Sequence, residues 1–80
     1  FYIRGEVKRE GRYPMTGGMT LNAAISVAGG YTEYAKRRKV QIKRGELSLV
    51  FAMQDIEAGK VEDPLIRRGD IVIVPRRWVF

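Results

Sequence analysis

Positively charged side chains are the groups in this sequence whose type and spacing point most clearly to chemistry. The chain of 80 residues carries 15 Lys and Arg against 9 Asp and Glu, a formal net charge of +6. One group of cations lies within residues 4–12 and another within residues 36–43. Side by side, the two groups would form a surface that contacts a polyanion; a solvated surface without a partner is the alternative. The candidate contact residues are Arg4, Lys8, Arg9, Arg12, Lys36, Arg37, Arg38, Lys39 and Lys43.

The residue types on which most catalytic sites depend are missing. The chain has no Cys and no His, and so no thiol nucleophile, imidazole base or soft metal ligand. Ser26 and Ser48 have no candidate base beside them in sequence, although a lysine-activated serine stays open. The acidic residues of 55–63 lack the spacing of a calcium loop, and no phosphate-binding loop precedes Lys60. We therefore expect no catalytic residue, no metal and no cofactor, and favour binding or assembly.

Two strands are predicted at the start of the chain. Residues 1–7 alternate between apolar and polar side chains, which is the periodicity of a strand. Residues 8–11 are typical of a hairpin turn, and residues 12–15 predict a second strand. Pro14 indicates that this second strand lies at a sheet edge or ends there.

A short buried helix is predicted next. Thr20 is a suitable N-cap, and apolar residues follow Leu21 at the spacing i, i+3, i+4 and i+7. Gly29 or Gly30 is expected to end the helix, because glycine adopts the left-handed conformation there without strain. Alanines on the helix would allow it to approach a sheet closely.

The remainder of the chain predicts a second hairpin and a central strand. Residues 39–43 and 47–51 alternate on either side of a turn that contains Gly45, and residues 54–59 predict a helical turn. Residues 71–74 are continuously apolar, which indicates a strand that is central or covered on both faces. The order β-β-α-β-β-(short α)-β predicts an α+β fold with one main helix, a short second helix and a mixed sheet of about five strands. This is the order of the β-grasp, or ubiquitin-like, architecture.

Several stretches, in this order, resemble the soluble-ligand-binding β-grasp (SLBB) domain of bacterial polysaccharide export proteins. Residues 2–14 resemble the first hairpin of that family, V-x-G-x-V-x-x-P-G-x-Y, except that Glu10 stands where Pro is usual. Residues 20–25 and 28–32 resemble its helix and the A-G-G-x-T exit, and residues 65–75 resemble its closing L-x-x-G-D-x-V-x-V-P. The resemblance covers nearly the whole chain.

The resemblance implies a single domain over residues 1–80, a fragment of a larger export protein, that is not an enzyme. It implies a location in the periplasm, as part of an outer-membrane-associated protein. Other parts of that protein, not this domain, would contact the membrane. The implied partners are other subunits of the export protein, an inner-membrane polysaccharide copolymerase and an acidic polysaccharide. The motif residues are expected to serve backbone turns: Gly5, Gly11, Gly29, Gly30, Gly69 and Asp70.

Two other functions compete with this one. A basic nucleic-acid-binding module would use the same cations together with tyrosines that stack on bases, Tyr2, Tyr13, Tyr31 and Tyr34. We do not expect nucleic acid as a partner, because the order of the motifs favours the export family. A small enzyme acting through Asp55 or Asp63 has the least support.

Overall fold

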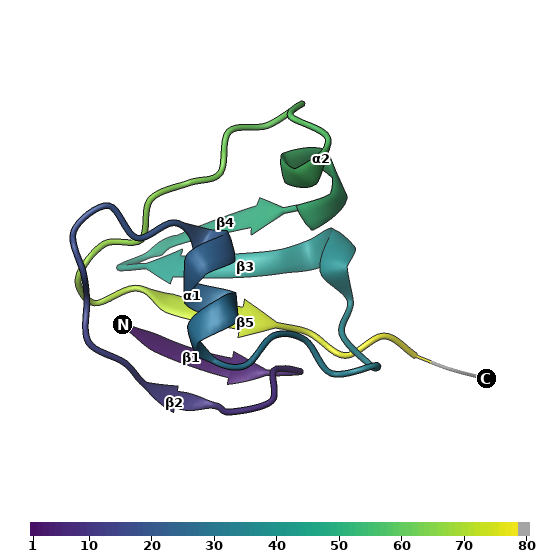
Figure 1. Cartoon of the computed structure of the whole chain (residues 1–80), viewed down its shortest axis with the longest axis horizontal. Helices are drawn as coiled ribbons and strands as arrows, with labels where there is room; N and C mark the ends of the chain where they lie inside the picture. The colour runs from purple at the N-terminus through teal and green to yellow at the C-terminus, as the bar shows by residue number, and fades with distance from the viewer. Residues whose placement is uncertain (79–80) are drawn as a thin grey trace.

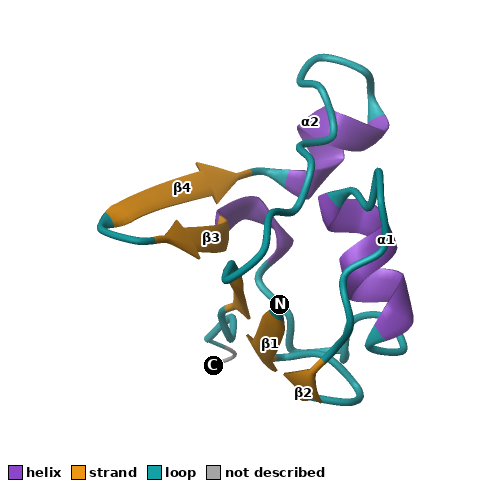
Figure 2. Ribbon diagram, turned by 90° about the vertical axis from the view of Figure 1, so that its left-hand side faces the viewer, coloured by secondary structure: helices purple, strands orange, loops and turns teal. Residues whose placement is uncertain are grey.

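The alternating strands and the capped helix assemble into a five-stranded mixed sheet with both helices on one side (Figures 1 and 2). The structure, a computed structural model, describes residues 1–78. It confirms the predicted α+β, β-grasp arrangement with one main and one short helix. The elements in chain order are β1 (Tyr2–Gly5), β2 (Gly11–Arg12), α1 (Leu21–Val27), the 3-10 helix η1 (Arg37–Lys39), β3 (Val40–Arg44), β4 (Leu47–Phe51), α2 (Met53–Glu57) and β5 (Ile71–Val74).

The last strand of the chain, β5, occupies the centre of the sheet. The strand order is β2-β1-β5-β3-β4, and β5 runs parallel to β1 and antiparallel to β3. The prediction of a central strand is confirmed, whereas cover on both faces is wrong. Val72 and Val74 are fully buried on the side of the helices, while Ile71 and Ile73 face the other side and remain partly exposed. We call that uncovered side the open face.

Helix α1 has the ends that its sequence predicted. The hydroxyl of Thr20 accepts a hydrogen bond from the amide of Ala23 at 3.3 Å, as an N-cap does. At the other end, Gly30 donates to the carbonyl of Ile25 at 2.9 Å and Gly29 donates to a carbonyl one turn back. Both glycines have positive φ, 89° and 86°, so together they form the Schellman motif that closes the helix.

The core lies between α1 and the sheet. Ile3 of β1, Ile42 of β3 and Val72 of β5 are fully buried, as are Leu21 and Ala24 on the facing side of α1. Burying a side chain such as Leu21 stabilises a fold by about 1.5–3 kcal/mol.

Two boundaries differ from the sequence prediction. The second strand covers only Gly11–Arg12 rather than residues 12–15. Its pairing ends at Tyr13, which exchanges backbone hydrogen bonds with Phe1. In this register no residue of 1–78 lies opposite Pro14 and Met15. The 3-10 helix η1 was not predicted, and it delays the start of β3 from residue 39 to Val40.

The helices that the structure describes do not have the features of a membrane span. Within residues 1–78, no helix combines the length and apolar character needed to span a bilayer.

Candidate functional site

The segment after β5 lies against the segment that precedes η1. The amide of Lys36 donates to the carbonyl of Pro75 at 2.7 Å, and the amide of Arg77 donates to the carbonyl of Tyr34 at 2.8 Å. These bonds form a short antiparallel bridge after the end of the sheet. Arg76 and Arg77 thereby lie beside the cations of residues 36–39, although about forty residues of sequence separate them.

The loop after β1 joins the same end of the molecule. Lys8 donates its amide to the carbonyl of Gly30 at 3.1 Å, and Arg9 donates to the carbonyl of Ala28 at 2.8 Å. These carbonyls belong to the C-terminal end of α1, where positive charge is favoured by the helix dipole. The backbone amides of Lys8 and Arg9 therefore support the segment that ends α1.

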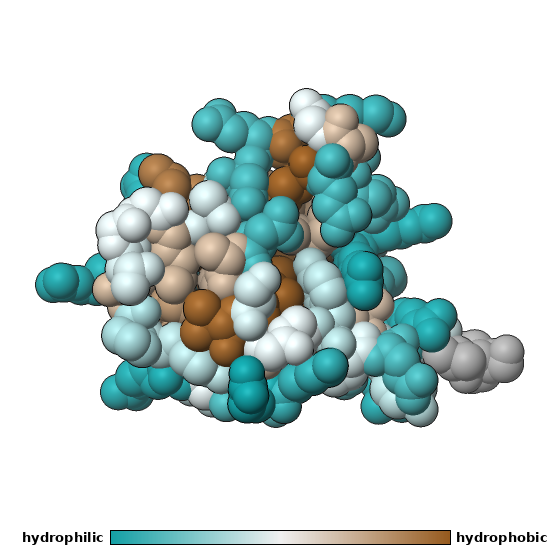
Figure 3. All heavy atoms as spheres, in the orientation of Figure 1, coloured by the Kyte–Doolittle hydropathy of each residue, from teal (hydrophilic) through white to brown (hydrophobic). Residues whose placement is uncertain are grey.

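We call the joined segments 6–9, 28–39 and 75–77 the basic end, which in Figure 1 extends from the lower end of α1 to the right-hand side. They carry two acidic residues, Glu6 and Glu33, against eight cations. None of these cations forms a salt bridge with another residue of 1–78. Hydrophilic side chains dominate this end of the surface (Figure 3). Its cations are Lys8, Arg9, Lys36, Arg37, Arg38, Lys39, Arg76 and Arg77.

Two arginines of the basic end lie flat on tyrosine rings. The guanidinium carbon of Arg37 is 4.4 Å from the ring centroid of Tyr31, and that of Arg76 is 4.4 Å from the centroid of Tyr34. Each such contact contributes about 0.5–1 kcal/mol at an exposed site and restricts the side chain. One face of each tyrosine is covered, so these rings support arginines rather than offering that face to a base or a sugar.

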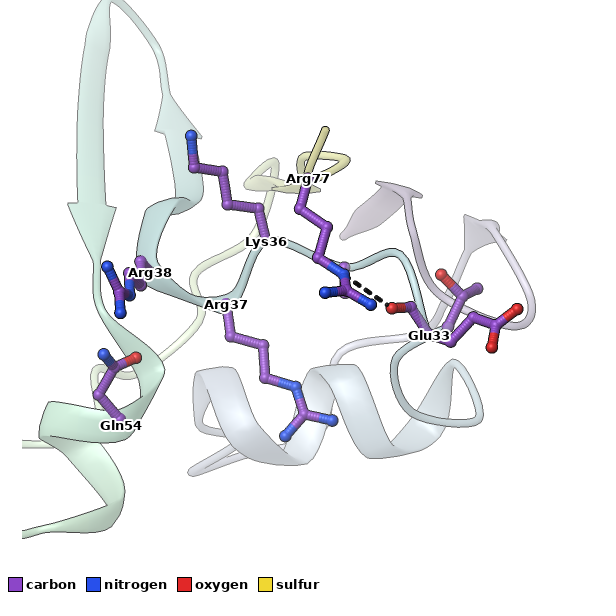
Figure 4. A pocket seen from close by; sticks show the side chains of 8 residues that line it. Glu33, Lys36, Arg37, Arg38, Gln54 and Arg77 are labelled. Carbon is purple, nitrogen blue, oxygen red and sulfur yellow. Dashed lines mark hydrogen bonds between the residues drawn. The ribbon is translucent and has the colours of Figure 1, made fainter. Parts of the chain in front are cut away.

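A hollow of about 520 Å³ opens among these side chains (Figure 4). Lys36, Arg37 and Arg38 leave one short segment in different directions, and Nε of Arg77 reaches back to the carbonyl of Glu33 at 3.0 Å. The charges surround the hollow without converging on one point. This geometry suits weak contact with a succession of anionic groups better than tight binding of one ligand. The lining residues are Thr32, Glu33, Ala35, Lys36, Arg37, Arg38, Gln54 and Arg77.

The other three candidate cations lie elsewhere. Arg4 and Arg12 come from β1 and β2, and Lys43 from β3, with β5 between them in the sheet. Arg4 follows the buried Ile3 and Lys43 follows the buried Ile42, so both project from the open face. The structure thus brings six of the nine candidates together and separates these three. Arg76 and Arg77 were missed because only the backbone bridge to residues 34–36 places them at the basic end.

A sequence profile of the SLBB domain matches residues 1–74. The chain belongs to the SLBB domain family. It is also 34% identical over 62 residues to the capsule polysaccharide export outer membrane protein CtrA of Neisseria meningitidis, in both serogroup A and serogroup B. The match covers 76% of this chain but only 16% of the length of each relative. The predicted resemblance is confirmed, and the SLBB domain corresponds to a small part of these longer proteins.

Asp70 of the SLBB domain organises the turn before β5. One of its carboxylate oxygens accepts a hydrogen bond from the amide of Arg67 at 2.8 Å, closing the turn that contains Gly69. The guanidinium of Arg44 binds both carboxylate oxygens, at 3.0 and 2.8 Å, and also donates to the carbonyl of Leu65. Burial raises the pKa of Asp70, but these hydrogen bonds and positive charges outweigh it and hold the pKa below its ordinary value. The ion pair with Arg44 was not predicted.

The acidic residues of the third hypothesis have structural contacts. Asp63 accepts a hydrogen bond from the amide of Asn22 at 3.3 Å, in the first turn of α1, where a carboxylate is favoured. Asp55 lies in the first turn of α2, where a carboxylate is likewise favoured. Among residues 1–78, no three acidic side chains gather closely enough to hold a metal ion.

Tyr31 should ionise unusually late in an alkaline titration. Burial raises its pKa from 10.0 to about 12, although the nearby charge of Arg37 lowers it in part, and its buried hydroxyl has no partner among residues 1–78. The unfolded chain would release this proton near pH 10, so the folded domain should lose stability as the pH rises from 10 towards 12. Ultraviolet titration should reveal one late phenol that is missing in Tyr31→Phe. A late phenol that persists in that variant would contradict the assignment.

Proposed function

We propose that this SLBB domain is a non-enzymatic module of a longer polysaccharide export protein and contacts an acidic polysaccharide through its basic end. One observation carries the proposal: eight cations gather where three segments meet, without a carboxylate partner among residues 1–78. Charge left unpaired in this way is available to an external polyanion. Membership of the SLBB family and the likeness to capsule polysaccharide export proteins support this polymer class.

Weak contact is the physically reasonable mode for such a module. Exposed ion pairs contribute about 0–1 kcal/mol each and are screened by salt. An anionic polymer could therefore exchange one contact for the next while it moves, whereas tight binding would hold it in place. The stacked Arg37 and Arg76 keep their charges at the surface while the polymer passes.

The partners and location of the module follow from the same proposal. We place it in the periplasm as one domain of an outer-membrane-associated protein, in contact with other subunits of that protein and with an inner-membrane polysaccharide copolymerase. The support is the likeness to outer-membrane exporters, of which this chain matches 16% of the length. No observation favours the nucleic-acid alternative, and two of the four tyrosines that it would use, Tyr31 and Tyr34, carry arginines on one face of their rings.

Removing charge from the basic end should weaken retention by an acidic polysaccharide. We expect the triple variant Arg37→Gln, Arg38→Gln, Arg77→Gln to bind roughly tenfold more weakly at low salt, because three exposed contacts are lost. Affinity electrophoresis in a gel that contains the acidic polymer measures this, and high salt should abolish retention in both proteins.

The matched control removes the same net charge from the open face. The variant Arg4→Gln, Arg12→Gln, Lys43→Gln should be retained almost as well as the unmodified domain. Equal loss in the two variants would show that net charge alone attracts the polymer, which would overturn the proposed site. A neutral polysaccharide and a DNA oligonucleotide in parallel gels test the polymer class.

A further inference from the structure

The two edges of the sheet differ in how well they are protected. Strand β2 forms one edge with only two residues, and Pro14 follows soon after. Strand β4 forms the other edge with five residues, Leu47–Phe51. Natural proteins usually protect a long edge with charge, proline or a bulge, because unpaired backbone groups invite another strand. None of the residues of β4 is charged or proline.

The backbone of β4 has free hydrogen-bonding groups. Arg44 pairs with Leu47 across the tight turn between β3 and β4, so Leu47 bonds back to β3. Because bonded and non-bonded pairs alternate along an antiparallel ladder, Ser48 and Val50 direct their N–H and C=O groups away from β3. No hydrogen bond from elsewhere in residues 1–78 reaches these groups.

Two apolar side chains of this edge are well exposed, and Leu49 and Phe51 are only partly buried. Leu47 is 61% exposed and Val50 is 56% exposed. Leu47, Leu49 and Phe51 share the face on which the helices lie, while Ser48 and Val50 belong to the open face. The chain has a net charge of +6, but β4 itself carries no charged residue. Two copies can therefore approach along this edge without bringing cations of the two strands together.

We propose that β4 pairs with β4 of a second copy of this chain, antiparallel, about a twofold axis at Leu49. The strand is self-complementary in this register, because each Leu47 lies opposite Phe51 of the other copy and the two Leu49 side chains meet. Ser48 of each copy lies opposite Val50 of the other, and the two pairs exchange four backbone hydrogen bonds. The two sheets then join into one continuous sheet.

A second copy is favoured over head-to-tail growth by the strand lengths. A head-to-tail contact would pair β4 with β2 of the next copy, and β2 offers only two residues before the ladder ends. The symmetric contact uses all five residues of β4 on both sides. The pairing of β4 does not depend on the polymer contact at the basic end, because none of the cations of the basic end lies on β4.

A single cysteine provides a sharp test, because the chain has none of its own. In the proposed register the two residues at position 49 form a non-hydrogen-bonded pair, with Cα atoms about 4.5 Å apart, which a disulfide can bridge. Under mild oxidation Leu49→Cys should therefore form a covalent dimer. Leu47→Cys is the matched control, because the two copies of that position lie about 13 Å apart along the strands and cannot be bridged. A monomeric Leu49→Cys, or equal cross-linking of both variants, would overturn the proposal.

A second measurement, sedimentation, uses the chain with Leu49 in place and without an introduced cysteine. Sedimentation should show association that rises with protein concentration and falls at least several-fold in Val50→Lys, because two lysines would then lie diagonally across the axis on the same face of the joined sheet. Val61→Lys changes an exposed valine away from β4 and should leave association unchanged. In hydrogen exchange, the amides of Ser48 and Val50 should become protected as concentration rises. If they exchange equally fast at every concentration, the edge does not pair.

Discussion

Replacing Gly5 by alanine should destabilise the domain by at least about 3 kcal/mol. Gly5 has a φ of +99°, and a Cβ built on it would lie 2.1 Å from the carbonyl oxygen of Val74. That oxygen belongs to the backbone of β5 and accepts the amide of Glu6 at 2.8 Å, so it cannot move without disturbing the parallel pair of β1 and β5. Urea denaturation followed by circular dichroism would measure the loss.

Gly18→Ala separates the two causes of this effect. Gly18 also has a positive φ, +74°, but nothing lies within 4 Å of a Cβ placed there. The substitution should therefore carry only the conformational strain of about 1–2 kcal/mol. If Gly5→Ala lost no more stability than Gly18→Ala, the close approach of β1 to β5 would not be a constraint on the sequence.

Replacing Asp70 by alanine should cost about 3 kcal/mol, near the lower end of the range for a broken buried ion pair. The Asp70 side chain is fully buried, whereas that of Arg44 is 24% exposed, so the abandoned guanidinium can recover some hydration. The amide of Arg67 would also lose its acceptor. Glu46→Ala removes a carboxylate from the exposed turn next to Arg44 and should change stability little, which makes it the control for net charge.

The same ion pair predicts a dependence on acid. The folded domain holds the pKa of Asp70 below its ordinary value of 3.8, whereas the unfolded chain has that ordinary value. The stabilisation is therefore fully present above pH 3.8 and is lost as the pH falls through the lowered pKa of the folded state. Asp70→Asn should flatten this part of the stability profile. An unchanged acid profile in that variant would mean that other carboxylates cause the loss.

The predictable parts of this fold depend on neighbours in sequence. The ends of α1 followed from Thr20 and the glycine pair, because a helix is capped by residues within a few positions. The central place of β5 followed from its unbroken apolar run, although alternation of burial along it showed that only one face is covered. The overestimated length of the second strand depends on its partner rather than on its own residues, because the register with β1 brings Tyr13 opposite Phe1 and leaves no residue of 1–78 opposite Pro14.

The unpredicted parts depend on contacts that only the folded chain makes. Arg44 and Asp70 are 26 residues apart, and no local pattern pairs them. Arg76 and Arg77 were visible as cations, but their neighbours at the basic end are fixed by the bridge between Ala35 and Arg76. Three of the nine candidate cations lie away from the other six for a related reason, since their places are set by the strands, and β5 enters between those that carry Arg4 and Lys43.

The position of β5 also has a consequence for how the domain is made. Ribosomes deliver β5 after every other strand of this sheet, yet it joins β1 to β3. Until it arrives, the nascent chain can form at most two hairpins with no sheet between them. The pairing of Tyr2 with Ile71 spans nearly the full sequence, and such distant contacts slow folding. The domain should therefore acquire protease resistance in one late step, after residue 74 has left the ribosomal tunnel.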